Sequence, residues 1–543
     1  MPTPIETAAQ YFENGNLQAA NAECDKILES DSSNVNALHL NGVIAYQRKD
    51  YLSAIEYLSS ADTIAQTNIE IKFALAASYE NNEQVPLAIT AYRTITSLAP
   101  QHIPARKQLA TLLSQTNEYQ LALNEFSTIL NIDPNNLDVL LAIAKQHAEL
   151  EEYERAAIIA NKLLNTNNMK ANFWNDLGLL FASLNELDHA IKCFEKSHKL
   201  DSGLINCQLN LASALQRNHC LEDAKNQYIR TLSEIANQDE FQIQYEKANY
   251  NLALIYLAEG HYQLAWQHLI KRPKKCHDLP SKTDLCNKKI LVLGEEGIGD
   301  ELTFLRFLRP LKLLNVEVDY VGSTKLKPLL ENSDLIHSYY LTLPNPENYH
   351  YHISLMDLPY ILDCTDIQYV QPLSLTPNYN LEHPIINKVK QSLLPKIGIT
   401  WKAGATNTAI SDKWLQKSLP IEVLSKIISK QDCLVVILQR NPNPEDIAYL
   451  HNHTKAKIID ASELNEQLDH MLLLLKHLDR YITVSNTNVH LFGALQKKCD
   501  VIVPFPGEWR WMDKGDRSPW YPNFTVHRQT KPNSWDSILD TIQ

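Results

Sequence analysis

The sequence predicts an α superhelical solenoid, followed by an α/β module of two Rossmann-like lobes. Two observations carry this prediction: a helical repeat of fixed length in the first half, and short apolar runs between helical patterns in the second. With 543 residues the chain is too long for one core. Its 44% hydrophobic and 21% charged residues are typical of soluble globular proteins.

The repeat is marked by small residues at an interval of 34 positions. Alanine recurs at Ala20, Ala54, Ala88, Ala122, Ala156, Ala190 and Ala224, and Ala265 follows after about seven inserted residues. Twelve positions before each stands another small residue, and four positions after it a large residue is frequent. The small residues fit where two short antiparallel helices cross, and the large ones fill the groove toward the next hairpin.

Residues 1–271 resemble the tetratricopeptide repeat family, most clearly around Trp174, Gly178 and Phe194, and contain about eight helical hairpins. The resemblance implies a concave groove that binds a protein or peptide partner. The alternative is a rigid spacer or dimerisation surface.

The helical pattern ends at Arg272, and a proline- and charge-rich stretch, 272–287, is predicted to be a linker. Strand-like apolar runs then alternate with helical patterns, which predicts a mainly parallel sheet covered on both faces. We expect an N-terminal lobe over 288–385 and a C-terminal lobe over 386–543. The predicted strands are the runs at 289–294, 317–323, 397–401, 433–438, 481–484 and 501–505.

The first chemical motif is LVLGEEGIGDELTF, in which a strand leads through Gly297 and Gly299 to Asp300 and an amphipathic helix. Glycines let a backbone approach a ligand closely, and a helix N-terminus favours a phosphate. The motif is neither GxGxxG nor a Walker A loop, which speaks against dinucleotide binding and ATP hydrolysis. The alternative for Asp300, favoured by the local pattern alone, is an ordinary N-cap.

Two further motifs follow predicted strands. ITWKAGATNT places Lys402 at the mouth of a strand, where a lysine could hold a phosphate as a point charge; the alternative is a solvated loop lysine. YITVSNTNVHLFGAL opens a helix with polar residues that offer donors to an anionic group; the alternative is helix capping, with the histidine packed on one helix face. The polar residues of the second motif are Ser485, Asn486, Thr487, Asn488 and His490.

The fourth motif, EWRWMDKGDRSPWYP, combines Trp509, Arg510 and further aromatic residues. Aromatic rings beside an arginine can stack on a sugar or a base. The alternative is the packing of a loop that is rich in glycine and proline.

Together and in order, EEGIGDELTFLRFLRPLK, HYHISLMDLP, IGITW, SNTNVHLFGAL and EWRWMDKGDRSPWYP resemble bacterial tetratricopeptide proteins related to the ADP-heptose:lipopolysaccharide heptosyltransferases. The resemblance spans about 288–528 and implies a two-lobed GT-B fold that uses a nucleotide-diphosphate sugar. It implies that the C-terminal lobe binds the donor, with Lys402 in the phosphate-contacting region and Thr487 and His490 near the donor. Asp300 resembles the catalytic base. His352, a recurrent histidine of this subgroup, is a possible acceptor or substrate contact, together with Trp509 and Arg510. Ser485 stands where related transferases commonly have aspartate. The protein O-GlcNAc transferases share the architecture but not the detailed motifs.

The predicted function is glycosyl transfer from a nucleotide-diphosphate sugar to a protein or glycan acceptor. Asp300 would take the acceptor proton, and the chain contains no Asp-x-Asp pair, so a metal-independent reaction without cofactor is expected. The alternative is a tetratricopeptide scaffold with a catalytically inactive transferase-like domain, which Ser485 favours.

Composition narrows the possible partners and the location. A net charge of −13 argues against nucleic acid. Nine cysteines without a CxxC pair fit reduced thiols. No apolar run is long enough for a transmembrane segment, and the N-terminus shows no secretory pattern, so a cytoplasmic location is expected.

Overall fold

A computed structural model describes residues 2–542, except for 168, 275, 277, 296, 332, 404–416, 430, 431, 532 and 533. The chain divides into two compact units, Met1–Leu184 and Asn185–Gln543, and each is described by itself. None of the described helices is both long enough and apolar enough to cross a membrane.

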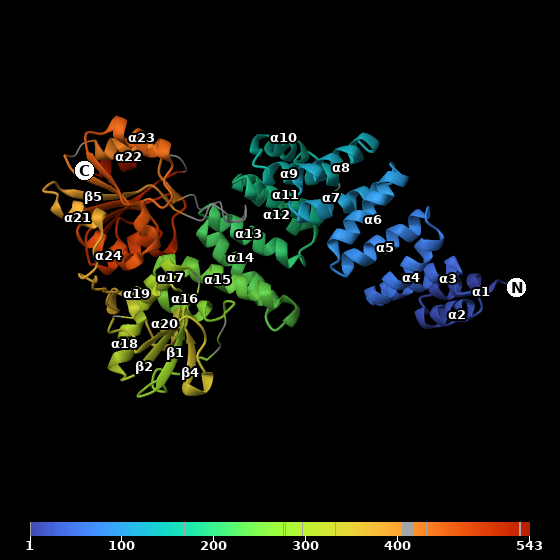
Figure 1. Cartoon of the computed structure of the whole chain (residues 1–543), viewed down its shortest axis with the longest axis horizontal. Coiled ribbons are helices and arrows are strands. Elements are labelled where there is room, and N and C mark those ends of the chain that lie inside the picture. The colour runs from blue at the N-terminus through green and yellow to red at the C-terminus, as the bar shows by residue number, and fades with distance from the viewer. Residues whose placement is uncertain are drawn as a thin grey trace. The chain divides into compact units, whose positions relative to one another are not determined.

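The first unit is a row of antiparallel helices (Figure 1, blue to teal). Its helices are α1 (Pro4–Glu13), α2 (Leu17–Ser30), α3 (Val35–Gln47), α4 (Tyr51–Ile64), α5 (Ile69–Asn81), α6 (Val85–Leu98), α7 (Ile103–Gln115), α8 (Tyr119–Ile132), α9 (Leu137–Glu149), α10 (Tyr153–Leu163) and α11 (Ala171–Ser183). Asparagine side chains cap several of these helices, as Asn34 does for α3 by accepting from the Ala37 amide.

The second unit begins with five more helices of the same kind. They are α12 (Leu187–Leu200), α13 (Ile205–Arg217), α14 (Leu221–Ile235), α15 (Gln242–Glu259) and α16 (Tyr262–Leu269). A short 3₁₀ turn, Asp239–Phe241, precedes α15, where the sequence predicts the insertion. The solenoid therefore comprises sixteen helices within the described residues.

The predicted repeat register is confirmed. All eight marker alanines, from Ala20 to Ala265, are fully buried. The backbone repeats as well, because the turn inside each hairpin has a residue with positive φ. These residues are Gly15, Lys49, Glu83, Asn117, Glu151, Asn185, His219 and Gly260, with φ from 59° to 80°. The last step is 41 residues instead of 34, which matches the insertion.

The first lobe is a parallel sheet of four strands in the order β3-β2-β1-β4. The strands are β1 (Lys289–Leu293), β2 (Glu317–Val321), β3 (Ser338–Tyr340) and β4 (Tyr351–Ser354). The helices are α17 (Ile298–Phe304), α18 (Leu308–Leu313), α19 (Lys327–Leu330) and α20 (Leu358–Ile361). Parallel pairing of β1 with both β2 and β4 puts the ends of β1 and β4 at one edge.

The second lobe has six parallel strands in the order β12-β11-β10-β5-β8-β9. These are β5 (Lys396–Thr400), β8 (Leu434–Ile437), β9 (Lys457–Asp460), β10 (Arg480–Val484), β11 (Cys499–Val503) and β12 (Phe524–Arg528); β6 (Lys402–Ala403) and β7 (Lys417–Ser418) form a separate antiparallel pair. The helices are α21 (Pro384–Gln391), α22 (Ile421–Ile428), α23 (Pro444–His453), α24 (Leu468–Lys476), α25 (Thr487–Ala494) and α26 (Asp536–Thr541).

The six predicted strands are present as β1, β2, β5, β8, β10 and β11, and the prediction of parallel sheets is confirmed. Strands β3, β4, β9 and β12 escaped prediction because they are short and carry polar residues. The final helix, α26, belongs to the second lobe, where its Ile538 is buried in the core.

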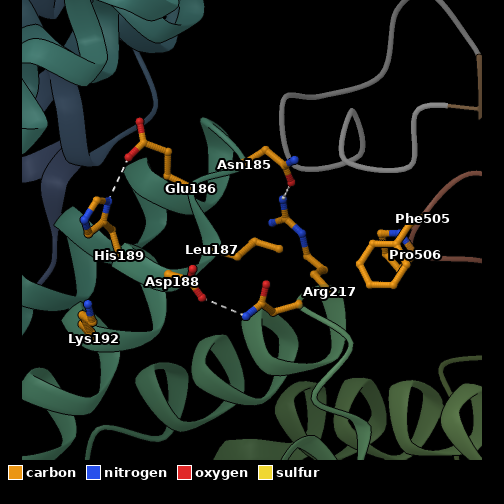
Figure 2. A pocket seen from close by; sticks show the side chains of 10 residues that line it. Asn185, Glu186, Leu187, Asp188, His189, Lys192, Arg217, Phe505 and Pro506 are labelled. Atoms are coloured by element: carbon orange, nitrogen blue, oxygen red, sulfur yellow. Dashed lines mark hydrogen bonds and ion pairs between the residues drawn. The ribbon is translucent and has the colours of Figure 1, made fainter. Parts of the chain in front are cut away.

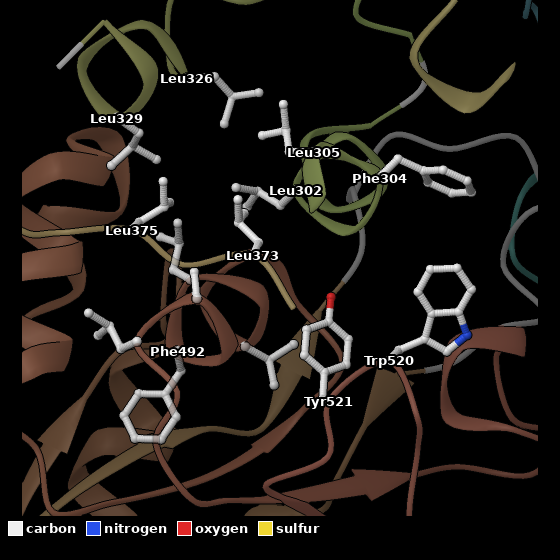
Figure 3. Close-up of a cluster of buried hydrophobic side chains, with 14 of the residues drawn as sticks. Leu302, Phe304, Leu305, Leu326, Leu329, Leu373, Leu375, Phe492, Trp520 and Tyr521 are labelled. Carbon is white, nitrogen blue, oxygen red and sulfur yellow. The ribbon is translucent and has the colours of Figure 1, made fainter. Parts of the chain in front are cut away.

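One hydrophobic core joins the last repeat to both lobes. It contains Tyr262 and Trp266 of α16, Phe304 of α17, and Phe492 of α25. In Figure 3, Leu302 and Phe304 of the first lobe face Tyr521 and Trp520 of the second. The indole of Trp266 also donates a hydrogen bond of 2.9 Å to the Cys364 carbonyl. The predicted border at 271/272 therefore runs through one compact unit.

Candidate functional site

Strand order defines where a ligand site belongs in the second lobe. Numbered within the lobe, the order is that of a doubly wound sheet, and its direction reverses between β5 and β10. Ligands of such sheets lie beyond the carboxyl ends of the two strands at this point. The segments that leave these strands carry Lys402 and Ser485.

Asp300 lies in the first turn of α17 but does not cap it. The N-cap is Gly297, and the Asp300 amide donates to the Gly297 carbonyl at 2.9 Å. The capping interpretation of Asp300 is therefore wrong, because the helix begins three residues earlier than a cap at Asp300 requires. The Asp300 carboxylate instead forms an ion pair with Arg510, and 30% of the aspartate side chain is exposed.

Arg510 starts a chain of alternating charges. Its guanidinium also bonds Glu508 at 3.1 Å, and Glu508 pairs with the Lys417 ammonium at 2.5 Å. Ser485 adds a hydrogen bond to the same carboxylate. Burial alone would raise the pKa of Glu508, but Lys417 and Arg510 lower it to about 2. Two carboxylates and two cations from both lobes thus meet at the ends of the strands, and we call these four residues the charge cluster.

His490 lies beside the charge cluster, at the interface of the lobes. Its Nδ1 is 2.6 Å from the Tyr521 hydroxyl, which is also 3.0 Å from the Thr303 hydroxyl. Burial, with a contribution from Arg510, holds the pKa of His490 well below its usual value, so the ring is neutral. A Cβ on Gly299 would lie 3.0 Å from His490 Nε2. Gly299 therefore allows α17 to approach α25 closely.

Some of the polar residues at the start of α25 have a structural role, whereas one is only half-buried and does not cap the helix. Asn486 is the N-cap and accepts from the Asn488 and Val489 amides at 2.8 and 3.2 Å. Asn488 is buried and donates to Asn465 at 2.9 Å. Thr487, the first helical residue, is half-buried. The capping interpretation is therefore correct for Asn486. Thr487 is the first residue of the helix and is not the cap.

Lys402 is exposed at the carboxyl end of β5. Gln439 holds its backbone, accepting from the Lys402 amide at 2.8 Å and donating to its carbonyl at 2.9 Å. The side chain is thereby presented at the switch point of the sheet. The loop predicted to follow it, 404–408, lies outside the described residues.

Trp509 and His352 take no part in the charge cluster. Trp509 packs edge-on against Trp520, with ring centroids 4.9 Å apart, and Arg510 lies 4.5 Å over its ring. His352 is on β4, and its Nδ1 is 3.8 Å from Asp278. The packing interpretation of the aromatic loop therefore fits Trp509, whereas Arg510 is an ion-pair partner within the site.

A second group of charges fills the equivalent point of the first lobe. Arg272 bonds Asp357 at 2.6 Å and the Glu295 carboxylate, while Lys274 bonds Asp357 at 2.6 Å. Burial opposes the charge of Arg272, but Asp357 and Glu295 raise its pKa above the usual value. Glu295 follows β1 and Asp357 follows β4. The predicted linker thus places two of its own cations where a ligand of this lobe would lie.

Among the described residues, one group of side chains has the spacing of a metal site: Glu317, Asp319 and His337. The Lys289 ammonium is 2.6 Å from Glu317 and 3.3 Å from Asp319. This cation balances the carboxylates at the amino edge of the sheet, away from the charge cluster.

Sequence reasoning missed Glu508 and Lys417. Their neighbours in the fold come from other strands, so no local spacing reveals them. The only signal was Glu508 itself, an acidic residue directly before Trp509 in the most specific motif.

A family model supports the repeats, because that of a tetratricopeptide repeat matches residues 171–203. Protein FlbA of Caulobacter vibrioides is 23% identical over 417 residues, which cover 70% of this chain and 67% of that protein. A tetratricopeptide repeat protein from Parabacteroides merdae is 18% identical with a TM-score of 0.39, covering 45% of this chain and 97% of its own. YrrB, described as a TPR protein with an unusual peptide-binding site, is 24% identical with a TM-score of 0.28, covering 30% and 84%.

The first part of the chain is thus a tetratricopeptide-type solenoid, a class of fold that suggests a protein-interaction scaffold. It is followed by parallel sheets.

Proposed function

We propose that the protein is a metal-independent glycosyltransferase of the GT-B type, resembling the heptosyltransferases. It would move a sugar from a nucleotide-diphosphate donor to a protein or glycan acceptor that the repeats recruit. The observation that carries the proposal is the charge cluster, in which Asp300 of one lobe meets Arg510, Glu508 and Lys417 of the other at the carboxyl ends of the strands.

The donor would lie at the switch point of the second lobe. The exposed Lys402 ammonium and the first turn of α25 at Thr487 offer positive charge to a leaving diphosphate. Asn486 already occupies two amides of that turn, so the donor would use Lys402 more than the helix. Ser485 is buried against Glu508, which supports a role in holding Glu508.

Asp300 would act as general base. Among the described residues, Arg510 engages its Oδ1, so Oδ2 would accept from an acceptor hydroxyl, and the side chain is partly exposed. As the hydroxyl attacks the anomeric carbon, its proton would pass to Asp300, while the bond from that carbon to the diphosphate breaks. Arg510 would keep the carboxylate oriented.

A second candidate function is a scaffold with an inactive transferase-like domain. It is favoured by the internal balance of the charge cluster, because two anions and two cations neutralise one another without a ligand. Ser485, in place of the aspartate of related transferases, favours it as well.

Thermal unfolding with a panel of sugar nucleotides separates the two candidates. A donor at 100 times its Kd should stabilise the protein by about 2.7 kcal/mol. Lys402→Ala should abolish the shift, whereas Lys514→Ala, whose side chain is 91% exposed, should leave it intact. If no sugar nucleotide shifts the wild-type transition, the scaffold is the function.

A further inference from the structure

A pocket of about 400 Å³ opens between the repeats and the α/β module inside the second unit (Figure 2). One wall is the start of α12, from Asn185 to Lys192, and the end of α13 with Arg217 and Asn218. Phe505 and Pro506, which follow β11, form the opposite wall. This volume is in the lower range of pockets that enclose part of a ligand.

The charges of the pocket disfavour a nucleotide. Glu186 and Asp188 stand in or next to the first turn of α12, and Lys192 and Arg217 face the same space, so two carboxylates lie beside two cations. His189 also lines the pocket and lies 2.9 Å from Glu186. A diphosphate would meet both carboxylates. A neutral polar ligand meets no such penalty.

The remaining lining matches a polypeptide. The side-chain amides of Asn185 and Asn218 carry donors and an acceptor, as a peptide group does. The Asn185 oxygen already accepts from the Arg217 guanidinium at 3.5 Å, which leaves its NH₂ group as the donor to a ligand. Asn218 uses one donor on Asp188, at 3.0 Å, which orients its amide. Leu187, Phe505 and Pro506 supply an apolar surface for one side chain of a bound segment.

The pocket is connected to the charge cluster by a short stretch of chain. Phe505 is followed after three residues by Glu508 and after five by Arg510, the partner of Asp300. Five residues span at most about 18 Å. The wall made by α12 and α13 is tied to the same loop, because His219, next to Asn218, pairs with Asp513 at 3.0 Å and its ring lies 5.1 Å from that of Phe505.

We propose that this pocket is an anchoring subsite for an acceptor polypeptide. It holds an extended segment at most about six residues from the residue that is modified. Peptide groups bind Asn185 and Asn218, and an apolar side chain packs on Leu187 and Phe505. This inference rests on the proposed glycosyl transfer and fixes the acceptor as protein.

The test uses the full-length protein on an array of synthetic random-sequence decapeptides. Peptides that bind are resynthesised with a fluorophore, and their affinities are measured by anisotropy. Phe505→Ala and Asn218→Ala should each weaken binding at least tenfold. Matched controls are Tyr379→Ala, at an exposed tyrosine, and Asn226→Ala, at an exposed asparagine on α14; both should bind as the wild type does.

The thermal shift caused by sugar nucleotides is recorded for the same variants. This separates the claim of a peptide-binding subsite from the claim of glycosyl transfer. Lost peptide binding with an unchanged shift supports the subsite. The pocket assignment is overturned if no decapeptide binds, if the pocket variants bind as tightly as the wild type, or if only a glycan array is bound. If peptides bind in the pocket but no sugar nucleotide raises the thermal unfolding transition of the wild type, the peptide is not an acceptor and the proposed glycosyl transfer is rejected as well.

Discussion

The carboxylate of Asp300 and the guanidinium of Arg510 form an ion pair across the two lobes of the module. Arg510 is almost fully buried, and it also holds Glu508 at 3.1 Å. Burial opposes the charge of Arg510, yet Asp300 and Glu508 raise its pKa above the usual value. The pair therefore links the base proposed for one lobe to the donor side of the other.

Arg272→Ala should destabilise the second unit strongly. The Arg272 side chain is fully buried and pairs with Asp357 and Glu295, so its removal leaves two buried carboxylates with less compensation. Breaking a buried pair in this way typically costs about 3–5 kcal/mol. The free energy of unfolding in urea measures the effect. Lys282→Ala, at an exposed position of the same segment, is the control. A wild-type value for Arg272→Ala would mean that 272–287 is only a linker.

The repeats and most core strands were predictable because each is encoded locally. The 34-residue interval of Ala20 and its successors follows from helices that cross at small residues. Apolar runs such as 433–438 identify buried parallel strands. The positive-φ turns at Lys49 and Glu83 were not predictable, because neither residue type favours that conformation and the repeat geometry imposes it.

The candidate site was predictable only in part, since its residues meet through the fold. Asp300 and Arg510 are both found from motifs, but nothing local shows that they pair. Lys417 and Glu508 come from a short hairpin and from the loop after β11, and their contact depends on the strand order. Arg272 looked like a linker residue because charge normally marks solvent exposure.

Gly42→Ala should destabilise the first unit, although alanine favours helices. The added Cβ would lie 2.5 Å from Leu58 Cγ, where α3 crosses α4. Overpacking of about 1–3 kcal/mol should exceed the helix-propensity gain of about 1 kcal/mol. Hydrogen exchange in α3 and α4 reports the local loss. Gly203→Ala, whose Cβ would meet Asp201 at 3.4 Å, is the matched control and should leave protection unchanged.

Acid should weaken the last repeat through His268. Burial, assisted by Lys271, lowers the pKa of His268 to about 4, whereas an unfolded histidine titrates near 6.5. The unfolded state thus binds more protons between these values, so the free energy of unfolding falls as pH drops from about 6.5 to 4. His268→Gln, which can keep the hydrogen bond to Asn249, should remove about 2 kcal/mol of this pH dependence. The full shift would correspond to about 3.4 kcal/mol, and solvent screening of the partly exposed ring reduces it. The role of His268 would be refuted if the free energy of unfolding, measured by chemical denaturation, depended on pH equally in the wild type and in His268→Gln.

Glu508→Gln is the control variant for the proposed role of Asp300 as general base. It removes a charge that pairs with Lys417 and Arg510 but leaves Asp300 and its second oxygen in place. This variant should bind the anionic donor at least as tightly as the wild type, because Lys417 and Arg510 lose the anion that neutralises them. Its turnover at saturating donor should remain within about tenfold of the wild type, because the base is retained.

Asp300→Asn should differ from Glu508→Gln in turnover. Asparagine keeps an oxygen that accepts from Arg510, and the α17 N-cap, Gly297, is untouched, so the fold and the donor-induced thermal shift should persist. Asparagine cannot take a proton from the acceptor, and general-base catalysis contributes about 10²–10⁴-fold. Turnover at saturating donor and acceptor should therefore fall by about that factor, with the KM for donor nearly unchanged. Initial rates with radiolabelled donor measure both quantities. Undiminished turnover in Asp300→Asn would remove Asp300 from the chemistry and leave it as the orienting partner of Arg510.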